Sequence, residues 1–443
     1  MENNPIKFID LFAGLGGIRL GFQNAFKAMG YNTECVLTSE LKPYALKTLQ
    51  HNFKNDFFAG DIFDINTAFI PDFDFLLGGF PCQPFSASGK RQGFLDTRGT
   101  LFFEIERILK AKQPYGFILE NVEGLVKHDL ASKNDKIGRT LTTILYKLEH
   151  ELGYKVTWKV LDALAFGLPQ SRKRIFIVGT KTDYINLEGN QPIFNTLNAI
   201  LEKGLPCLES NFSKKILQHF NIEDLHGKSI KDKRGGENNI HSWDIGLKGT
   251  ITKNQSQLLT QIFKARRKKQ WALEIGIDWM DGMPLTLNQI ASFAKQPINE
   301  LQNMLNDLTQ KGYLKLEYPK KLIKEISGSA IKTYRVYDDT KPLGFNIVTG
   351  KLSFEINKIL DPNNIAPTLV ATDVARLAVP DGKGLRKLTI REGLRLFGYP
   401  EWYQIPTKEV EAFDLLGNTV AVPVVAFIAE KLAEIYKENE VFI

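Results

Sequence analysis

The first 180 residues alternate short apolar runs with longer amphipathic stretches. Apolar, β-rich runs that are typical of buried strands lie at 6–13, 34–39, 58–61, 73–78, 115–119 and 174–179. Stretches with helical periodicity lie at 18–29, 43–53, 100–112 and 139–152. Strands that alternate with helices in this way predict an α/β fold built on a doubly wound, mainly parallel sheet.

The pattern changes after residue 180. Residues 181–245 are rich in Asn, Lys, Gly and Ser, and a dense basic run, KARRKK, follows at 264–269. Residues 284–318 then show two amphipathic helices and an alternating strand, which is the order of a winged helix-turn-helix. The same order fits a small helical subdomain that packs its own apolar stripe, so both interpretations stay open.

Regular structure returns near residue 385, with helix-like stretches at 389–397 and 420–437. A chain of 443 residues is longer than one ordinary core requires. We therefore expect residues 1–180 and 386–443 to build one domain, and residues 181–385 to form a smaller inserted domain.

The composition is that of a globular protein and predicts neither a membrane span nor a disulfide framework. Hydrophobic residues make up 43% and charged residues 24%, as in ordinary globular proteins. No apolar run reaches the length of a membrane span, and the N-terminus lacks a secretory signal, so we expect no membrane and a cytoplasmic location. Cys35, Cys82 and Cys207 are an odd, widely spaced set that predicts neither disulfides nor a metal site. The net charge of +7 favours a polyanionic partner, although weakly.

Ligands of doubly wound sheets bind beyond the carboxyl ends of the strands. The first such end is followed by DLFAGLGG at 10–17, where glycines allow close approach of the backbone to a ligand. Glu40 follows the second strand, where a carboxylate can hold ribose hydroxyls. This arrangement indicates an adenosine-type cofactor, although the glycines alone fit a simple tight turn equally well.

Two later strand ends carry reactive side chains. Cys82 lies in the turn GGFPCQPFS at 78–86, a setting that exposes a thiol and can lower its pKa. Glu120 ends the next strand, where burial would raise the pKa of the carboxyl group and make it a proton donor. Arg172 and Arg174 could bind a phosphate or a base carbonyl, and an isolated pair of this kind also fits a solvated edge strand.

Taken in order, these motifs closely resemble the cytosine-C5 DNA methyltransferases, in particular the bacterial type II modification enzymes. The resemblance covers residues 6–180 and 386–437. It rests on DLFAGLGG at 10–17, Glu40, Asp61, GGFPCQPFSASGK at 78–90, ENV at 120–122, QSRKR at 170–174, RKLTIREGLRLFGYP at 386–400 and LLGNTVAVPVV at 415–425. It implies a Rossmann-like methyltransferase domain that uses S-adenosylmethionine, releases S-adenosylhomocysteine and needs no metal.

The resemblance also implies a role for each matching residue. Cys82 would add to C6 of cytosine, and Glu120 would contact N3 and help to supply a proton there. Arg172 and Arg174 would flank the base and hold either Glu120 or the base carbonyl, with Arg174 favoured as the contact to the base. Residues expected around the cofactor are Phe12, Ala13, Gly14, Gly16, Gly17, Glu40, Leu41, Asp61, Ile62, Pro81, Asn418 and Val420. Residues expected near DNA are Gln83, Ser86, Ser88, Lys90 and Arg98.

The implied chemistry explains these residue types. Addition of a thiolate at C6 makes C5 of cytosine nucleophilic enough to take the activated methyl group. The base must leave the duplex to be reached, so the resemblance also implies base flipping. Nothing in the sequence identifies the group that removes the C5 proton, and water is one candidate. Many members of the family carry an aromatic residue where this chain has Leu41, so its cofactor affinity could differ.

The resemblance makes the inserted segment a target-recognition domain, whose basic clusters would contact phosphates of double-stranded DNA. We expect the unit at 284–318 to help dock the DNA. A restriction endonuclease specific for the same site, a monomeric state and association with the nucleoid are further expectations. An RNA methyltransferase of the same superfamily and a non-catalytic DNA-binding regulator are the rival interpretations. The long basic insertion argues against the first rival, and the intact Cys82, Glu120 and arginines argue against the second.

Overall fold

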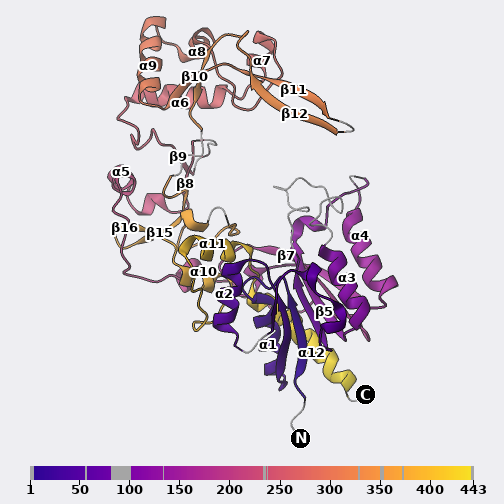
Figure 1. The fold of residues 1–443 in the computed structure, drawn as a ribbon. Coiled ribbons are helices and arrows are strands. Elements are labelled where there is room, and N and C mark those ends of the chain that lie inside the picture. The colour runs from indigo at the N-terminus through magenta and orange to yellow at the C-terminus, as the bar shows by residue number, and fades with distance from the viewer. Residues whose placement is uncertain are drawn as a thin grey trace. The chain divides into compact units, whose positions relative to one another are not determined.

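The computed structural model describes residues 4–54, 57–80, 101–132, 134–232, 236, 238–327, 330–349, 354–371 and 374–440. The chain forms two compact units (Figure 1). Unit 1 comprises residues 1–205, 361–375 and 388–443, and unit 2 comprises residues 206–360 and 376–387. Residues 181–205 and 361–375, which the sequence analysis placed in the inserted domain, therefore belong to unit 1.

Unit 1 is built on a seven-stranded sheet with the order β3-β2-β1-β4-β5-β7-β6. The first five strands in this order pair in parallel, and β7 pairs antiparallel with both β5 and β6. The sheet confirms the predicted mainly parallel fold. The strands are β1 Ile6–Leu11, β2 Thr33–Ser39, β3 Phe58–Ala59, β4 Phe75–Gly79, β5 Gly116–Val122, β6 Lys155–Asp162 and β7 Lys173–Thr180.

Helices cover both faces of this sheet, because alternate strand residues point to opposite sides. Phe8 and Ile118 pack in one apolar cluster with helices near both chain ends, while Ile9 and Leu119 pack in a second cluster with the central helices. The first cluster uses α1 Gly17–Ala28 and α12 Val422–Glu440. The second uses α3 Leu101–Lys112 and α4 Arg139–Tyr146. The remaining helices are α2 Pro43–Asn52, α10 Ile390–Leu396 and α11 Glu409–Asn418.

The C-terminal segment completes the core of unit 1. Helix α12 lies along α1, and a Cβ added at Gly21 would come within 2.6 Å of Val425 Cβ. A Cβ at Gly17 would lie 2.7 Å from the Tyr399 hydroxyl and 2.9 Å from Val420 Cγ2. Glycine at these positions therefore lets the return segment approach the helix that follows the glycine-rich turn.

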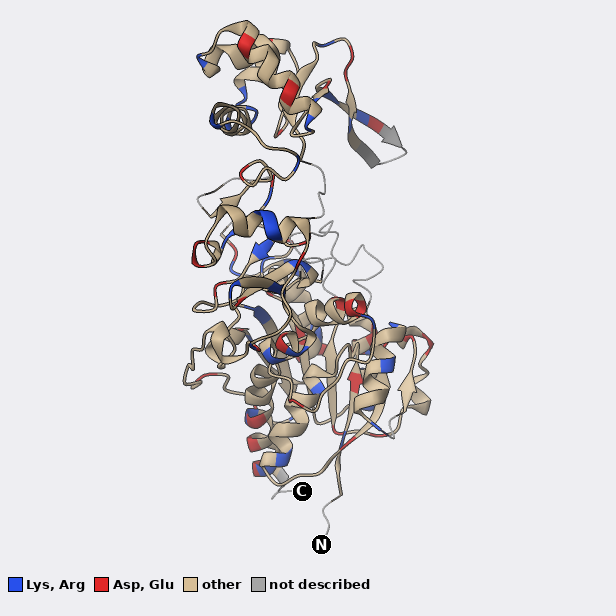
Figure 2. Cartoon of the chain, turned by 90° about the vertical axis from the view of Figure 1, so that its left-hand side faces the viewer, with Lys and Arg blue, Asp and Glu red and all other residues tan. Residues whose placement is uncertain are grey.

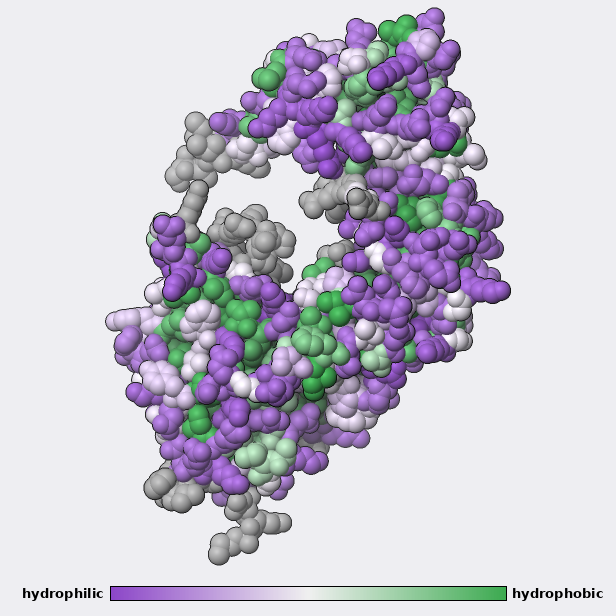
Figure 3. All heavy atoms as spheres, turned by 180° about the vertical axis from the view of Figure 1, so that it is seen from behind, coloured by the Kyte–Doolittle hydropathy of each residue, from purple (hydrophilic) through white to green (hydrophobic). Residues whose placement is uncertain are grey.

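Unit 2 has two parts, each with its own apolar cluster. One part holds α5 Asn211–His219 and a small sheet of β8 Ser229–Ile230, β9 Asn239–Ile240, β14 Lys358–Ile359, β15 Leu377–Asp381 and β16 Gly384–Lys387. The other part holds α6 Lys253–Ala265, α7 Gln270–Ile275, α8 Leu287–Ala294, α9 Ile298–Gln310, β10 Leu314–Glu317, β11 Lys320–Ser327, β12 Ala330–Tyr337 and β13 Gly344–Ile347. Hydrophilic residues cover most of the face of unit 2 seen in Figure 3.

The second part of unit 2 has helices α8 and α9 in the stretch where the sequence showed two amphipathic helices. A three-residue connection joins these helices, and Lys295 within it takes a left-handed conformation with φ 52°. Strand β10 pairs with β13, and Leu285 forms an isolated antiparallel bridge to Phe345 of β13. The β11–β12 hairpin lies between β10 and β13 in the chain and forms a two-stranded sheet of its own.

Among the described residues, no single helix has both the length and the apolar composition needed to cross a bilayer. Helices α11 and α12 meet the test only when they are joined as a pair, which is bent by 41°.

Candidate active site

The strand order of unit 1 reverses between β1 and β4, because the chain runs outward from β1 to β3 and then returns to β4. Ligands of doubly wound sheets bind at the carboxyl ends of the strands at such a reversal. The glycine-rich turn follows β1, Glu40 follows β2, and the segment that contains Cys82 follows β4. The topology therefore brings the ends of the three strands that precede these features to one edge of the sheet.

The turn after β1 has an unusual backbone. Phe12, Gly14 and Gly16 all lie in the left-handed region, with φ of 57°, 56° and 65°. A bulky residue seldom adopts this conformation unless its surroundings impose it. Position 16 also has no room for a side chain, because an added Cβ would lie 2.7 Å from the Phe53 ring. The turn is thus a fixed feature that precedes the N-terminus of α1.

Glu40 holds this turn from the neighbouring strand. Its Oε2 accepts a hydrogen bond of 2.8 Å from the Gly14 N–H. Its Oε1 accepts from the N–H groups of Leu41 and Lys42, also at 2.8 Å. A carboxylate offers about four acceptor positions, so three backbone bonds leave capacity for a ligand hydroxyl. Glu40 therefore orients the turn and keeps an acceptor at the edge of the sheet.

Apolar side chains stand exposed beside the two predicted carboxylates. Leu41 is 62% exposed next to Glu40, and Phe63 is 52% exposed after Asp61. Asp61 Oδ1 accepts a hydrogen bond of 3.1 Å from the Phe63 N–H, while Ile62 is buried. Carboxylate acceptors beside exposed apolar groups match a nucleoside, which has ribose hydroxyls and a flat base. The residues present therefore fit the predicted adenosyl cofactor.

Glu120 and Arg174 form a buried ion pair at the carboxyl end of β5, and we call the part of the sheet edge around them the reacting edge. Glu120 lies near the end of β5, in register with Gly79 of β4. Arg174 Nε lies 3.0 Å from Glu120 Oε1, and both side chains are largely buried. Burial raises the pKa of the Glu120 carboxyl group, against the opposing charges of Arg174 and Arg172. A raised pKa favours the protonated acid that the sequence analysis expected at this position.

Arg172 acts on Glu120 through its charge and is anchored by backbone oxygens. Its guanidinium is buried and donates hydrogen bonds to the backbone oxygens of Leu369 (2.9 Å), Gly417 (3.2 Å) and Thr419 (2.6 Å). It also lies 5.0 Å from the centre of the Phe397 ring. Arg172 therefore ties the start of β7 to the segments that return to unit 1. Arg174 forms the ion pair with Glu120 described above.

Asn121 has a role that the sequence analysis did not assign. Its side-chain nitrogen donates to the backbone oxygen of Phe80 at 3.2 Å, and its oxygen accepts from the Val122 N–H at 2.8 Å. This buried amide fixes the last described residue before Pro81 and Cys82. Cys82 and the other predicted residues of that segment lie outside the described residues: Pro81, Gln83, Ser86, Ser88, Lys90 and Arg98.

A polar cluster joins the start of α2 to α11, next in sequence to the predicted cofactor residues Glu40 and Leu41. The Asp414 carboxylate accepts hydrogen bonds of 2.6 Å from both Lys42 Nζ and the Tyr44 hydroxyl. Asn418, a predicted cofactor residue, donates from its side chain to the Asp414 backbone oxygen at 2.8 Å. Lys42 and Tyr44 are more than 350 residues from Asp414 in sequence. No local motif could therefore have revealed this cluster.

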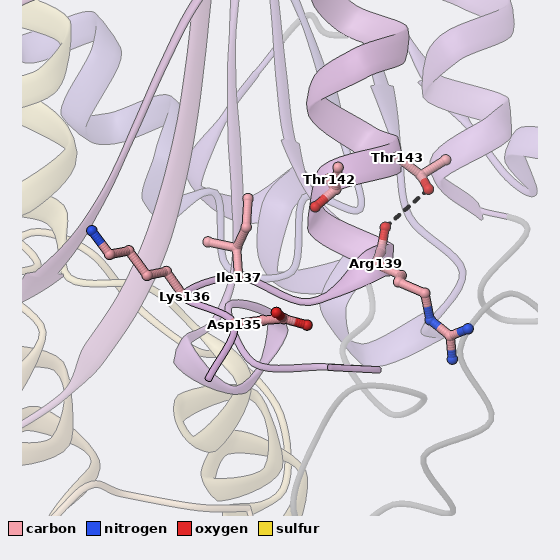
Figure 4. A pocket seen from close by; sticks show the side chains of 6 residues that line it. All are labelled: Asp135, Lys136, Ile137, Arg139, Thr142 and Thr143. Atoms are coloured by element: carbon pink, nitrogen blue, oxygen red, sulfur yellow. Dashed lines mark hydrogen bonds between the residues drawn. The ribbon is translucent and has the colours of Figure 1, made fainter. Parts of the chain in front are cut away.

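An open hollow lies elsewhere in unit 1, at the start of α4 (Figure 4). It is lined by Asp135, Lys136, Ile137, Arg139, Thr142 and Thr143. The Thr143 hydroxyl is turned back to the Arg139 backbone oxygen, to which it donates at 2.9 Å (Figure 4). None of the predicted site residues lines this hollow, so we do not assign the reaction to it.

Known proteins resemble this chain over nearly its whole length. Residues 6–434 match the family model described as C-5 cytosine-specific DNA methylase. The chain is 57% identical to the type II methyltransferase M.NlaIV of Neisseria lactamica, over 96% of this chain and 98% of the relative. It is 41% identical to the type II methyltransferase M.BanI of Aneurinibacillus aneurinilyticus, over 99% and 97%.

The fold has a counterpart among solved structures. A methyltransferase from Entamoeba histolytica aligns over 98% of this chain and 99% of that chain, with a TM-score of 0.54 and 14% identity. At this identity the match supports the shared fold alone.

Proposed function

The chain belongs to the C-5 cytosine-specific DNA methylases and is a DNA cytosine-5-methyltransferase, and on this premise we propose how its residues carry out the reaction. In the proposal, it modifies one specific duplex sequence, acts on a cytosine flipped out of the helix, and uses Cys82 as a covalent nucleophile. The observation that carries the proposal is the buried Glu120–Arg174 pair at the carboxyl end of β5, in register with the strand that leads to Cys82.

Cys82 would add as a thiolate to C6 of the flipped cytosine while Glu120 donates a proton to N3. The electron-rich C5 would then take the methyl group, which leaves S-adenosylhomocysteine. Loss of the C5 proton to a base, for which water is one candidate, would expel the Cys82 thiolate, and the N3 proton would return to Glu120. Arg174 lies against Glu120 and can orient the carboxyl group toward the base, and it offers further N–H donors to the base carbonyl. Asn121 would position the cysteine turn through its bond to the Phe80 backbone.

S-adenosylmethionine would supply the activated methyl group. Glu40 would accept from the ribose hydroxyls, while Leu41 and Phe63 would cover the faces of the adenine. Phe12, Ala13, Gly14, Gly16 and Gly17 would line the methionine portion, with Asp61, Ile62, Pro81, Asn418 and Val420 around them. Among the described residues, no group of His, Cys, Asp and Glu could hold a metal ion. The proposed chemistry requires none.

The relatives named as type II methyltransferases support a role in restriction and modification. We propose that unit 2 selects the target sequence on double-stranded DNA, and that a restriction endonuclease cuts the same sequence when it is unmodified. Flipping and methylating one base at a time needs no second copy of the chain, so the proposed enzyme acts as a monomer on the chromosome of its host.

The decisive test uses purified protein, radiolabelled S-adenosylmethionine, duplex DNA of mixed sequence and transfer RNA. We expect label in 5-methylcytosine of DNA at one repeated sequence, and no label with Cys82→Ser. Label on transfer RNA alone would replace the proposal with RNA methylation. Label at many unrelated sequences would contradict sequence-specific modification, and label that survives in Cys82→Ser would remove Cys82 from its proposed role.

A further inference from the structure

The positive charge of the chain is concentrated in one stretch of unit 2. Residues 252–347 contain fifteen Lys and Arg against nine Asp and Glu, a net charge of +6 out of +7 for the whole chain. Lys and Arg residues recur along this part of the molecule, including the hairpin (Figure 2). A basic stretch within an otherwise nearly neutral protein marks the surface that meets a polyanion.

Two elements compete for that role, and their charges differ. Helix α9 occupies the second-helix position of the helix-turn-helix, the usual reading helix of such units. It contains Glu300 and Asp307 but neither Lys nor Arg, so its net charge is −2. The β11–β12 hairpin contains five Lys and Arg and one Glu, so its net charge is +4. Electrostatics therefore favours the hairpin.

The strand register places the hairpin cations unevenly. Residues directly opposite each other share one face of a two-stranded sheet. Lys320 pairs with Tyr337, Leu322 with Arg335, and Lys324 with Thr333, so one face carries three cations and, through residue 324, no carboxylate. On the other face, Lys321 already forms an ion pair of 3.3 Å with Asp338. The first face is the more positive and the better suited to phosphates.

Contacts extend this face to the basic run before α7. Lys320 Nζ lies 4.7 Å from the centre of the Tyr337 ring. Arg335 donates to the Trp279 backbone oxygen at 3.0 Å, and Lys269 Nζ lies 5.8 Å from the centre of the Trp279 ring. Tyr337 and Trp279 are themselves substantially exposed. Cations and exposed aromatic rings thus form one continuous surface, which we name the basic hairpin surface: Lys269, Trp279, Lys320, Lys324, Arg335 and Tyr337.

We propose that the basic hairpin surface is the main DNA-docking surface of unit 2, and that α9 supports it without holding the DNA. The proposal rests on the proposed function, because it assumes that duplex DNA is the substrate. A two-stranded ribbon fits the major groove of DNA. Eight residues per strand span roughly 27 Å, most of one helical turn. Lys320, Lys324 and Arg335 then lie near the phosphates that border the groove.

The contacts of α9 support this division of roles between the helix and the hairpin. Helix α9 buries Leu301, Leu305 and Leu308 in the apolar cluster that also contains Tyr313 and Leu314 at the base of β10. Gln255 Nε2 and Lys311 Nζ each donate a hydrogen bond of 2.6 Å to the Asp307 carboxylate of this helix. The helix is therefore committed to packing and to internal polar contacts. Among the described residues the hairpin pairs with no further strand, and an isolated hairpin of this kind gains little stability by itself.

The test compares three double variants of the full-length protein by fluorescence anisotropy on duplex DNA that contains the methylated site, across a range of salt concentrations. Lys320→Ala with Lys324→Ala should weaken binding roughly tenfold to thirtyfold near physiological salt and reduce the slope of log Kd against log salt by about two. Asn303→Ala with Asn306→Ala, on the exposed face of α9, should leave Kd within about twofold and the slope unchanged. Lys320→Arg with Lys324→Arg should restore binding.

Thermal unfolding of each variant shows whether the fold is retained, and these side chains lie at least partly in solvent. Full affinity and slope in the lysine variant would overturn the proposal. A loss in the α9 variant equal to or larger than that in the lysine variant would transfer the docking role to α9. The wild-type preparation is also assayed for methyl transfer to the same DNA. Failure of that assay refutes the proposed function, whereas an unaffected lysine variant of an active enzyme refutes this inference alone.

Discussion

The reacting edge of unit 1 and the basic hairpin surface of unit 2 use charge in opposite ways. In unit 1, Glu120 and Arg174 are buried and lie 3.0 Å apart. In unit 2, Lys324 is exposed and Lys320 lies over a partly exposed tyrosine ring. Charges in a buried site interact strongly and are little affected by salt, whereas exposed charges are screened within about 10 Å at moderate salt.

This difference separates two kinds of function. A buried pair can shift the pKa of an acid and orient it, which changes the rate of a chemical step. An exposed basic surface binds phosphates by releasing counterions, which changes affinity and its salt dependence. We therefore expect substitutions at the reacting edge to alter rate and pH dependence, and those on the hairpin to alter Kd and its salt slope.

The largest effect should come from the nucleophile. Cys82→Ala removes the thiolate that makes C5 reactive, so the rate of methyl transfer should fall on the order of 10⁴-fold or more. Single-turnover incorporation of radiolabelled methyl groups measures this loss. With DNA that carries 5-fluorocytosine at the target, wild type should form an adduct that survives denaturation, and the variant should form none. An adduct in the variant would identify another nucleophile.

Glu120→Gln should have the next largest effect. It replaces the acid by a neutral amide, and the single-turnover rate should fall about 10³-fold, equivalent to about 4 kcal/mol. Burial raises the pKa of Glu120, and donation needs its protonated form, so the wild-type rate should decrease as pH rises through that pKa. The variant should lack this decrease. An unchanged alkaline limb in Glu120→Gln would assign the titration to a different group.

Arg172→Met tests the structural side of the reacting edge. It leaves three buried backbone oxygens without their donor, so the free energy of unfolding should fall by about 3 kcal/mol. Urea unfolding followed by circular dichroism measures this change. Lys173→Met, at an exposed neighbouring position, is the control and should change stability by less than about 0.5 kcal/mol. Equal stability of both variants would show that the three hydrogen bonds contribute little.

The smallest effect should appear at the proposed cofactor site. Leu41→Trp offers a larger flat surface to adenine, so the Kd for S-adenosylmethionine should fall roughly twofold to fivefold. Isothermal titration calorimetry measures it, with Leu41→Ala as a control that should weaken binding. Neither variant should change the salt slope of DNA binding. Weaker binding by the tryptophan variant would place the adenine away from Leu41.

The sequence predicted unit 1 well because its strand ends are marked by local signals. The turn at 10–17 and the residue types at Glu40 and Glu120 indicated the cofactor and catalytic positions before any packing was known. The predicted α/β fold is confirmed, although β6 was missed. Its residues Lys155–Asp162 mix lysines with apolar side chains and were therefore not recognised as a buried strand.

Other features depend on distant contacts that a local pattern cannot show. The backbone partners of Arg172 lie 197 to 247 residues away, and the motif alone suggested a role near the base. In the run at 264–269, Arg266 is buried and bonded to Asn346, whereas Lys269 is exposed. The β11–β12 hairpin was also not predicted. Its Ser-Gly-Ser at 327–329 between two β-rich runs was the available signal.

The most direct test of the separation between the two regions is the salt dependence of DNA binding, measured side by side for wild type, Glu120→Gln and the Lys320→Ala, Lys324→Ala double variant. We predict that Glu120→Gln keeps the wild-type slope of log Kd against log salt, and that the lysine variant loses about two from it. Equal slopes for all three proteins would contradict the account, as would a reduced slope in Glu120→Gln.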